Sequence, residues 1–141
     1  MPEDWNRRLI AEFHAKHGRG IGRWGDRLLL LVTKGAKSGR AHLVPLAYHR
    51  DGARYVVAAS NSGRPADPIW YRNLLAHPRA TIEVGDEHLD VVATALASGP
   101  ERDRLFAAHA ALMPGFGDYA RKTARVIPVV VLAPPGVAGL R

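Results

Sequence analysis

Residues 27–60 read RLLLLVTKGAKSGRAHLVPLAYHRDGARYVVAAS, in which three apolar runs of strand length alternate with turn residues. The runs cover residues 27–33, 42–50 and 54–60. Asp51 and Gly52 separate the second run from the third, and an Asp-Gly pair is typical of the tight turn in a β-hairpin. The stretch therefore predicts neighbouring antiparallel strands.

The remainder of the chain continues this pattern and inserts helices. Residues 80–84 and 87–97 predict a second hairpin around Gly85 and Asp86, and the apolar residues 127–132 predict a last strand. Helical spacing of apolar residues predicts helices at 5–16, 69–76 and 100–112, with a short helix or turn at 116–123. We expect an α+β fold of about six mostly antiparallel strands with three or four helices. A small barrel is its natural closure, because an open sheet of such apolar strands would expose its edges.

Two of these helices carry start signals. Asp67 precedes Pro68, which predicts Asp67 as the N-cap and Pro68 as the first helical residue. Ser98 is followed three residues later by Glu101, the spacing of a capping box.

The helix predicted at residues 5–16 is amphipathic. Its apolar face comprises Trp5, Leu9, Ile10 and Phe13. We expect this face to pack on the sheet; a neighbouring copy of the chain and a membrane surface are the alternatives. The glycine-rich residues 18–26 predict a flexible loop after the helix.

The composition is that of one folded domain, with 141 residues, 47% of them hydrophobic and 23% charged. We expect a single domain over residues 1–141, with an N-terminal helix and loop at 1–26 and a flexible tail at 134–141. The chain has no cysteine, which excludes disulfides and cysteine nucleophiles. No apolar run is long enough to span a membrane, and the first residues do not resemble a secretory signal. We therefore expect a cytoplasmic protein, with peripheral contact at the inner face of the membrane as an alternative.

The charge points to an anionic partner. Lys and Arg number 20 against 13 Asp and Glu, which gives a net charge of +7. The cations are dispersed, whereas a nucleic-acid-binding arm would gather them in one run. We expect a small anionic ligand and no nucleic acid.

The loop at residues 33–40, TKGAKSGR, is a candidate phosphate site. It places three cations, two glycines and two hydroxyl residues between two predicted strands. Glycine allows a ligand to approach the backbone, whose N–H groups then form an anion-binding nest. Lys37 and Arg40 add charge, and Ser38 adds a hydroxyl donor. A solvated hairpin loop is the alternative.

Two further segments are candidates to surround a ligand. Residues 58–73, AASNSGRPADPIWYRN, begin with small side chains against which a flat ring can lie, and continue into a polar loop and a helix start that favours an anion. Residues 113–123, MPGFGDYARKT, place Phe116 and Tyr119 beside two glycines, as in a mobile flap. Tyr119 is a candidate proton donor. The seven histidines lack the spacing of metal ligands, and we expect no metal site.

Four stretches resemble, in order, the motifs of the deazaflavin (F420)-dependent nitroreductase family of actinobacteria, which includes quinone reductases. They read LLLLVTKGAKSGRAHLVPLAYHRDG, RYVVAASNSG, DPIWYRNLLAHP and MPGFGDYARKTARVIPVVVL, and they span most of residues 28–133. The resemblance implies a split β-barrel of the FMN-binding type that binds the 8-hydroxy-5-deazaflavin coenzyme F420. It also implies an oxidoreductase that transfers hydride from reduced F420 to a quinone, enone or nitroaromatic acceptor.

The resemblance implies coenzyme contacts in the phosphate loop, a strand under the coenzyme, the wall beside its ring, the helix opposite and the flap. Ser60 and Tyr119 are the implied catalytic residues, Ser60 as a hydrogen-bond donor to the ring or acceptor and Tyr119 as a source of the proton. The implied coenzyme-binding residues are Ala36, Lys37, Ser38, Gly39, Arg40, His42, Leu43, Val44, Pro45, Leu46, Ala47, Ala58, Ala59, Ser60, Asn61, Ile69, Trp70, Tyr71, Arg72, Asn73 and Phe116.

The chain departs from the family pattern at several of these positions. Ala36 and His42 stand where relatives often carry arginine, and Met113 and Phe116 stand where characterised nitroreductases tend to have tyrosine. The resemblance therefore supports coenzyme binding more directly than it supports nitroaromatic reduction. An FMN-binding relative and a non-catalytic F420 carrier are the alternatives, and we expect a monomer or a homodimer.

Overall fold

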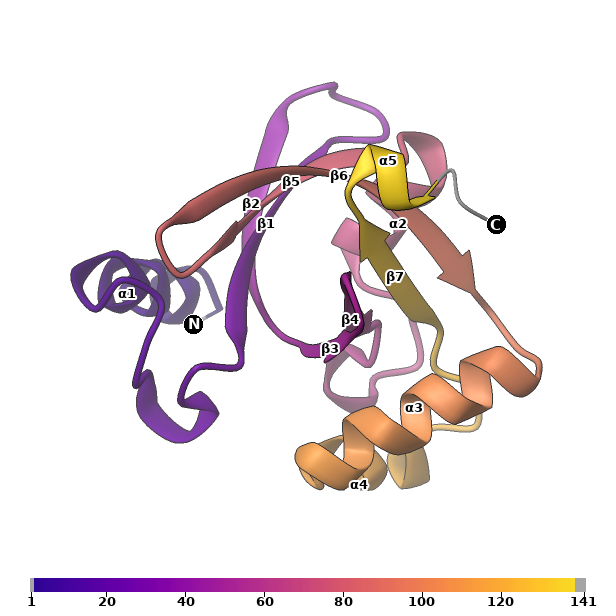
Figure 1. The fold of residues 1–141 in the computed structure, drawn as a ribbon. Helices are drawn as coiled ribbons and strands as arrows, with labels where there is room; N and C mark the ends of the chain where they lie inside the picture. Colours follow the sequence, from indigo (N-terminus) through magenta and orange to yellow (C-terminus); the bar gives the residue numbers. More distant parts are fainter. Residues whose placement is uncertain (1, 139–141) are drawn as a thin grey trace.

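The computed structural model describes residues 2–138, and their strands form one antiparallel sheet that curves into a half-barrel (Figure 1). The sheet order is β2-β1-β5-β6-β7-β4-β3. The α+β class and the barrel-like closure expected from the sequence are confirmed. The strands are β1 (Leu28–Lys34), β2 (Ala41–Ala47), β3 (His49–Asp51), β4 (Arg54–Ala58), β5 (Arg79–Val84), β6 (Glu87–Leu96) and β7 (Val129–Ala133).

The run expected as one strand at residues 42–50 is divided between the two edges of the sheet. β2 forms one edge and β3 the other, and Tyr48 lies between them. The Tyr48 N–H donates to the Arg27 carbonyl oxygen at 2.9 Å, which anchors this corner to the start of β1. Because a single residue joins the two edge strands, the sheet must curl until its edges approach each other.

The helices cover both faces of the curved sheet. α1 lies beside β1 and β2, while α3 and α4 lie together next to β3 and β4 (Figure 1). The short helix α5 occupies part of the expected flexible tail, and residues 139–141 of that tail lie outside the described residues. The helices are α1 (Pro2–Ala15), α2 (Ile69–Ala76), α3 (Pro100–Leu112), α4 (Gly115–Lys122) and α5 (Pro135–Ala138), with 3-10 turns η1 (Gly22–Trp24) and η2 (Asn61–Gly63).

Both predicted helix caps are wrong. Pro68 occupies the N-cap of α2, and Gly99 that of α3, each without a side-chain cap bond. The Asp67 carboxylate instead accepts a hydrogen bond from Arg125 at 2.8 Å, and Glu101 accepts one from Arg104 at 2.7 Å. A guanidinium makes a stronger, charge-assisted hydrogen bond to a carboxylate than a neutral backbone N–H does.

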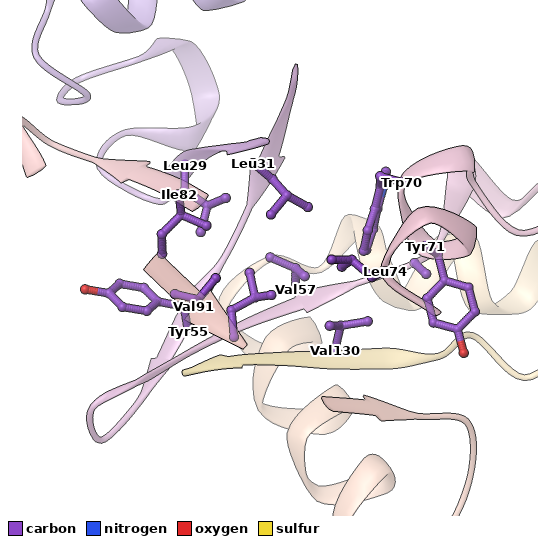
Figure 2. Close-up of a cluster of buried hydrophobic side chains, with 12 residues drawn as sticks. Leu29, Leu31, Tyr55, Val57, Trp70, Tyr71, Leu74, Ile82, Val91 and Val130 are labelled. Carbon is purple, nitrogen blue, oxygen red and sulfur yellow. The ribbon is translucent and has the colours of Figure 1, made fainter. Parts of the chain in front are cut away.

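The main core lies inside the half-barrel, with α2 closing it. Figure 2 shows Trp70 and Leu74 extending from α2 toward Leu31 and Val57 of the sheet. Leu31 and Val57 are fully buried, and each such side chain contributes about 1.5–3 kcal/mol of burial free energy. Since Trp70 belongs to this cluster, α2 is held rigidly against the barrel.

The N-terminal helix packs on the outside of β1, which confirms the expectation that its apolar face lies on the sheet. Leu9 and Phe13 join Ile21 and Leu28 in a second buried cluster. The apolar face that membrane contact would need is therefore covered, apart from Trp5, and such contact stays a prediction. The segment after α1 is a structured turn rather than the expected flexible loop, because Ile21 is fully buried. Across residues 2–138, no helix is long and apolar enough to cross a bilayer.

Candidate active site

A cleft of about 1190 Å³ lies between β2, the segment that joins β4 to α2, and the start of α4. All six residues of β2 from 42 to 47 line it. Most of the side chains that the sequence singles out meet here, although their positions in the chain are far apart. The predicted residues that line the cleft are His42, Leu43, Val44, Pro45, Leu46, Ala47, Ala58, Ser60, Asn61, Ile69, Trp70, Arg72, Phe116 and Tyr119.

Three predicted contacts lie behind the lining. Ala59 is fully buried, and Tyr71 and Asn73 are buried on the inner side of α2. Burial, and after it the Asp67 carboxylate, raise the pKa of Tyr71, so its phenol stays protonated at neutral pH. These residues support the wall of the cleft rather than form its surface.

Asn73 connects α2 to the predicted phosphate loop. Its side-chain oxygen accepts a hydrogen bond from the Ala36 N–H at 3.0 Å, and its Nδ2 donates to the Thr33 hydroxyl oxygen at 3.0 Å. The loop and the adjoining part of the cleft therefore share α2 as a common support.

The phosphate loop itself is not part of the cleft lining. Residues 36–40 form the exposed tip of the β1–β2 hairpin. The Ser38 hydroxyl oxygen accepts a hydrogen bond from the Arg40 N–H at 3.1 Å. A Cβ on Gly35 would lie 2.5 Å from the same oxygen, so any larger residue there would displace the Ser38 hydroxyl from its hydrogen bond. The loop can meet only a ligand that extends beyond the cleft.

The lining is positively charged. Four arginines line the cleft: Arg23, Arg27, Arg64 and Arg72. Among the side chains that the structure describes, Asp67 is the one acid in the lining, and Arg125 binds it at 2.8 Å. This excess of positive charge, together with an apolar β2 wall, fits a ligand that has a flat ring and anionic groups.

The α4 end of the cleft rests on a stack of rings. Phe116 meets the His109 ring edge-on, with centroids 4.3 Å apart, and contacts Tyr119 at 5.6 Å. The Nδ1 atoms of His109 and His49 are 2.8 Å apart and form a buried hydrogen bond. Burial, and after it the neighbouring His49 ring, lower the pKa of His109 to about 3, and burial also lowers the pKa of His49. The pair is therefore neutral at physiological pH.

Sequence reasoning missed the contribution of the N-terminal segment to the cleft. Trp5 is 56% exposed and approaches Trp24, with ring centroids 6.2 Å apart. The helical pattern placed Trp5 on the packing face, and only the pairing of two tryptophans with nearby arginines could have indicated a surface role. The N-terminal lining residues are Trp5, Asn6, Arg23, Trp24 and Arg27.

Comparison with known proteins agrees with this geometry. The family model of the F420H(2)-dependent quinone reductases matches residues 5–134. An F420H(2)-dependent quinone reductase of Mycobacterium tuberculosis is 38% identical over 132 residues, which cover 87% of this chain and 89% of that protein.

Two solved structures are also similar. One, an F420-H2 dependent reductase called FDR-A, is 36% identical with a TM-score of 0.69, and the match covers 75% of this chain and 93% of that one. The other, described as a domain-swapped dimer, is 33% identical with a TM-score of 0.71, over 94% of this chain and 99% of that one. The resemblance inferred from the four sequence stretches is thus confirmed, and the chain belongs to the F420H(2)-dependent quinone reductases, split-barrel oxidoreductases whose cofactor is coenzyme F420.

Proposed function

We propose that this protein reduces a quinone in the basic cleft, with the reduced coenzyme F420 bound beside β2. The observation that carries the proposal is the convergence of the family-matching residues on one open, arginine-lined cleft. The names of the mycobacterial relatives support a quinone as the acceptor. Bound there, the reduced coenzyme supplies hydride from C5 of its deazaflavin ring to the acceptor.

The residues of the chain bind and orient the two reactants. The arginines attract the anionic coenzyme, and the small side chain of Ala58 leaves room for a ring against the strand end. Ser60 donates a hydrogen bond from its hydroxyl group to the deazaflavin ring or to the acceptor. Phe116 and Tyr119 cover the acceptor and reduce its contact with water. Holding the two reacting atoms about 3–3.5 Å apart lowers the barrier by several kcal/mol.

The direct test is titration of the purified protein with oxidised F420, followed by oxidation of reduced F420 with menadione as acceptor. We expect saturable binding and turnover. Binding without turnover over a panel of quinones would favour a non-catalytic carrier, and retention of FMN with no affinity for F420 would favour an FMN-binding protein.

Lys37→Ala tests whether the exposed hairpin tip holds the coenzyme phosphate. We expect the Kd for F420 to rise about tenfold, about 1.4 kcal/mol, because a charge-assisted hydrogen bond is lost. Lys16→Ala is the matched control, since Lys16 carries the same charge just after the end of α1 and pairs with Glu12 at 2.8 Å. If both variants bind F420 with equal affinity, Lys37 does not contact the coenzyme.

Tyr119→Phe tests the proton donor. We expect kcat with menadione to fall about tenfold with an unchanged Kd for F420, within the usual range for loss of a general acid. Tyr48→Phe removes a hydroxyl that donates to the Asp26 carbonyl oxygen at 3.3 Å, away from the cleft lining, and should leave kcat unchanged. A large loss of F420 affinity in Tyr119→Phe would make Tyr119 a binding residue instead.

A homodimer is the assembly that we propose. The support is the similar structure described as a domain-swapped dimer, over 94% of this chain.

A further inference from the structure

The segment that joins β4 to α2 has an unusual backbone. Asn61 and Ser62 have φ values of 49° and 56°, and Gly63 continues with 79°. Left-handed conformations are unfavourable for residues other than glycine, so the surrounding structure must hold them. Seven residues of this segment line the cleft: Ser60, Asn61, Ser62, Arg64, Ala66, Asp67 and Pro68.

Arg125, which follows α4, binds both ends of this segment. Its guanidinium donates to the carbonyl oxygens of Ala59 at 3.2 Å and Ser60 at 2.8 Å, where the segment begins. The same side chain donates to the Arg64 carbonyl oxygen at 2.9 Å and the Asp67 carboxylate at 2.8 Å, where it ends. Only a guanidinium has enough donors, in a rigid plane, to satisfy four acceptors at once.

The same segment also positions α4. A Cβ on Gly63 would lie 3.0 Å from the Lys122 Cβ and 3.1 Å from the Tyr119 carbonyl oxygen, so the two backbones touch there. A shift of the segment would therefore move the helix that carries Phe116 and Tyr119.

We infer that Arg125 is a positioning residue of the coenzyme site: it holds residues 59–67 in the shape that forms one wall of the cleft. Its side chain is 17% exposed and is not part of the cleft lining, so it acts through the segment and not on the coenzyme. The inference rests on the proposed function and adds a residue to it.

The test compares Arg125→Met, which removes every donor, with Arg125→Lys, which keeps the charge but cannot span both ends of the segment. Binding of oxidised F420 is titrated well below the melting temperature, and amide hydrogen exchange is followed without coenzyme. We expect at least a tenfold rise in Kd for Arg125→Met and a smaller rise for Arg125→Lys. Exchange should be faster in residues 59–67 and unchanged in β1 and β5.

Arg121→Met is the matched control, because Arg121 lies on α4 with a side chain 74% exposed and pairs only locally, with Asp118. We expect its Kd and exchange to equal those of the wild type. If Arg125→Met does not fold, Arg125→Lys decides by the same criteria. If a folded Arg125 variant binds F420 as the wild type does, the inference about Arg125 is overturned and the proposed function is unaffected. A wild-type protein without F420 affinity would overturn the proposed function and the inference with it.

Discussion

Gly18→Ala should lower the free energy of unfolding by about 3 kcal/mol. Gly18 has a φ of +73°, and an added Cβ would lie 2.8 Å from the Gly85 backbone nitrogen and 2.9 Å from the Phe13 ring. The left-handed conformation costs an alanine about 1–2 kcal/mol, and overpacking adds about 1–3 kcal/mol. The strain falls where the end of α1 meets the β5–β6 turn, and it would loosen the helix that brings Trp5 to the cleft. Urea unfolding measures the loss.

Gly20→Ala separates the two causes. Gly20 has a similar φ of +61°, but nothing lies within 4 Å of the added Cβ. This variant should lose only the backbone contribution, about 1–2 kcal/mol. If the two variants are equally stable, the close approach of Gly18 to Gly85 does not affect the free energy of unfolding.

The buried histidine pair should make the protein less stable in acid. The unfolded chain binds a proton at His109 near pH 6.5, whereas in the folded state burial lowers the pKa of His109 to about 3. Below pH 6.5 the unfolded state therefore binds more protons, and the free energy of unfolding falls as pH falls. Between pH 7.5 and 5.0 this contribution is about 2 kcal/mol, since each pH unit below 6.5 costs about 1.36 kcal/mol.

The geometry explains why the pair resists protonation. The two Nδ1 atoms share one proton, so charging both rings would place two N–H groups against each other across 2.8 Å. Asp51 opposes the lowered pKa of His49, and Arg104 adds to it. Since Phe116 rests on His109, acid should also loosen the α4 end of the cleft.

His109→Gln keeps hydrogen-bonding groups and removes the titration. Urea unfolding at pH 7.5 and 5.0 should show about 2 kcal/mol less dependence on pH in this variant than in the wild type. His88→Gln, at a side chain that is 68% exposed, should behave as the wild type does. An unchanged pH dependence in His109→Gln would mean that the pair does not control acid stability.

Local patterns were sufficient for most of the secondary structure. The predicted helix at residues 69–76 coincides with α2. The hairpin predicted at Asp51 and Gly52 joins β3 to β4, but its turn lies one residue later, at Gly52 and Ala53, because Asp51 pairs with Arg54 in the ladder. The predicted caps failed because a cap depends on which partner reaches the side chain, and Arg125 reaches Asp67 from 58 residues away. The break at Tyr48 was also invisible, because Tyr48 itself favours a strand and no turn residue separates β2 from β3.

For the cleft, local motifs indicated which residues could bind a ligand, but they did not indicate which of these residues lie close together. The small residues near 58 and the Phe116–Tyr119 segment were recognisable by composition, and the strand at residues 42–47 by the resemblance to the family. All three meet in the cleft. The N-terminal aromatic residues and Arg125 belong to no recognisable motif. Their place at the cleft depends on contacts between residues that are far apart in the sequence.

The amino-acid order alone was thus enough for the class of fold, the family and the anionic nature of the ligand, because strand periodicity, motif order and net charge are local or additive properties. Folding in three dimensions decided which of the matching residues face the cleft, that the hairpin tip with Lys37 lies outside its lining, and that Arg125 holds its wall. Those features depend on how a sheet curls and on which distant groups then come within hydrogen-bonding distance, and no local pattern encodes that distance.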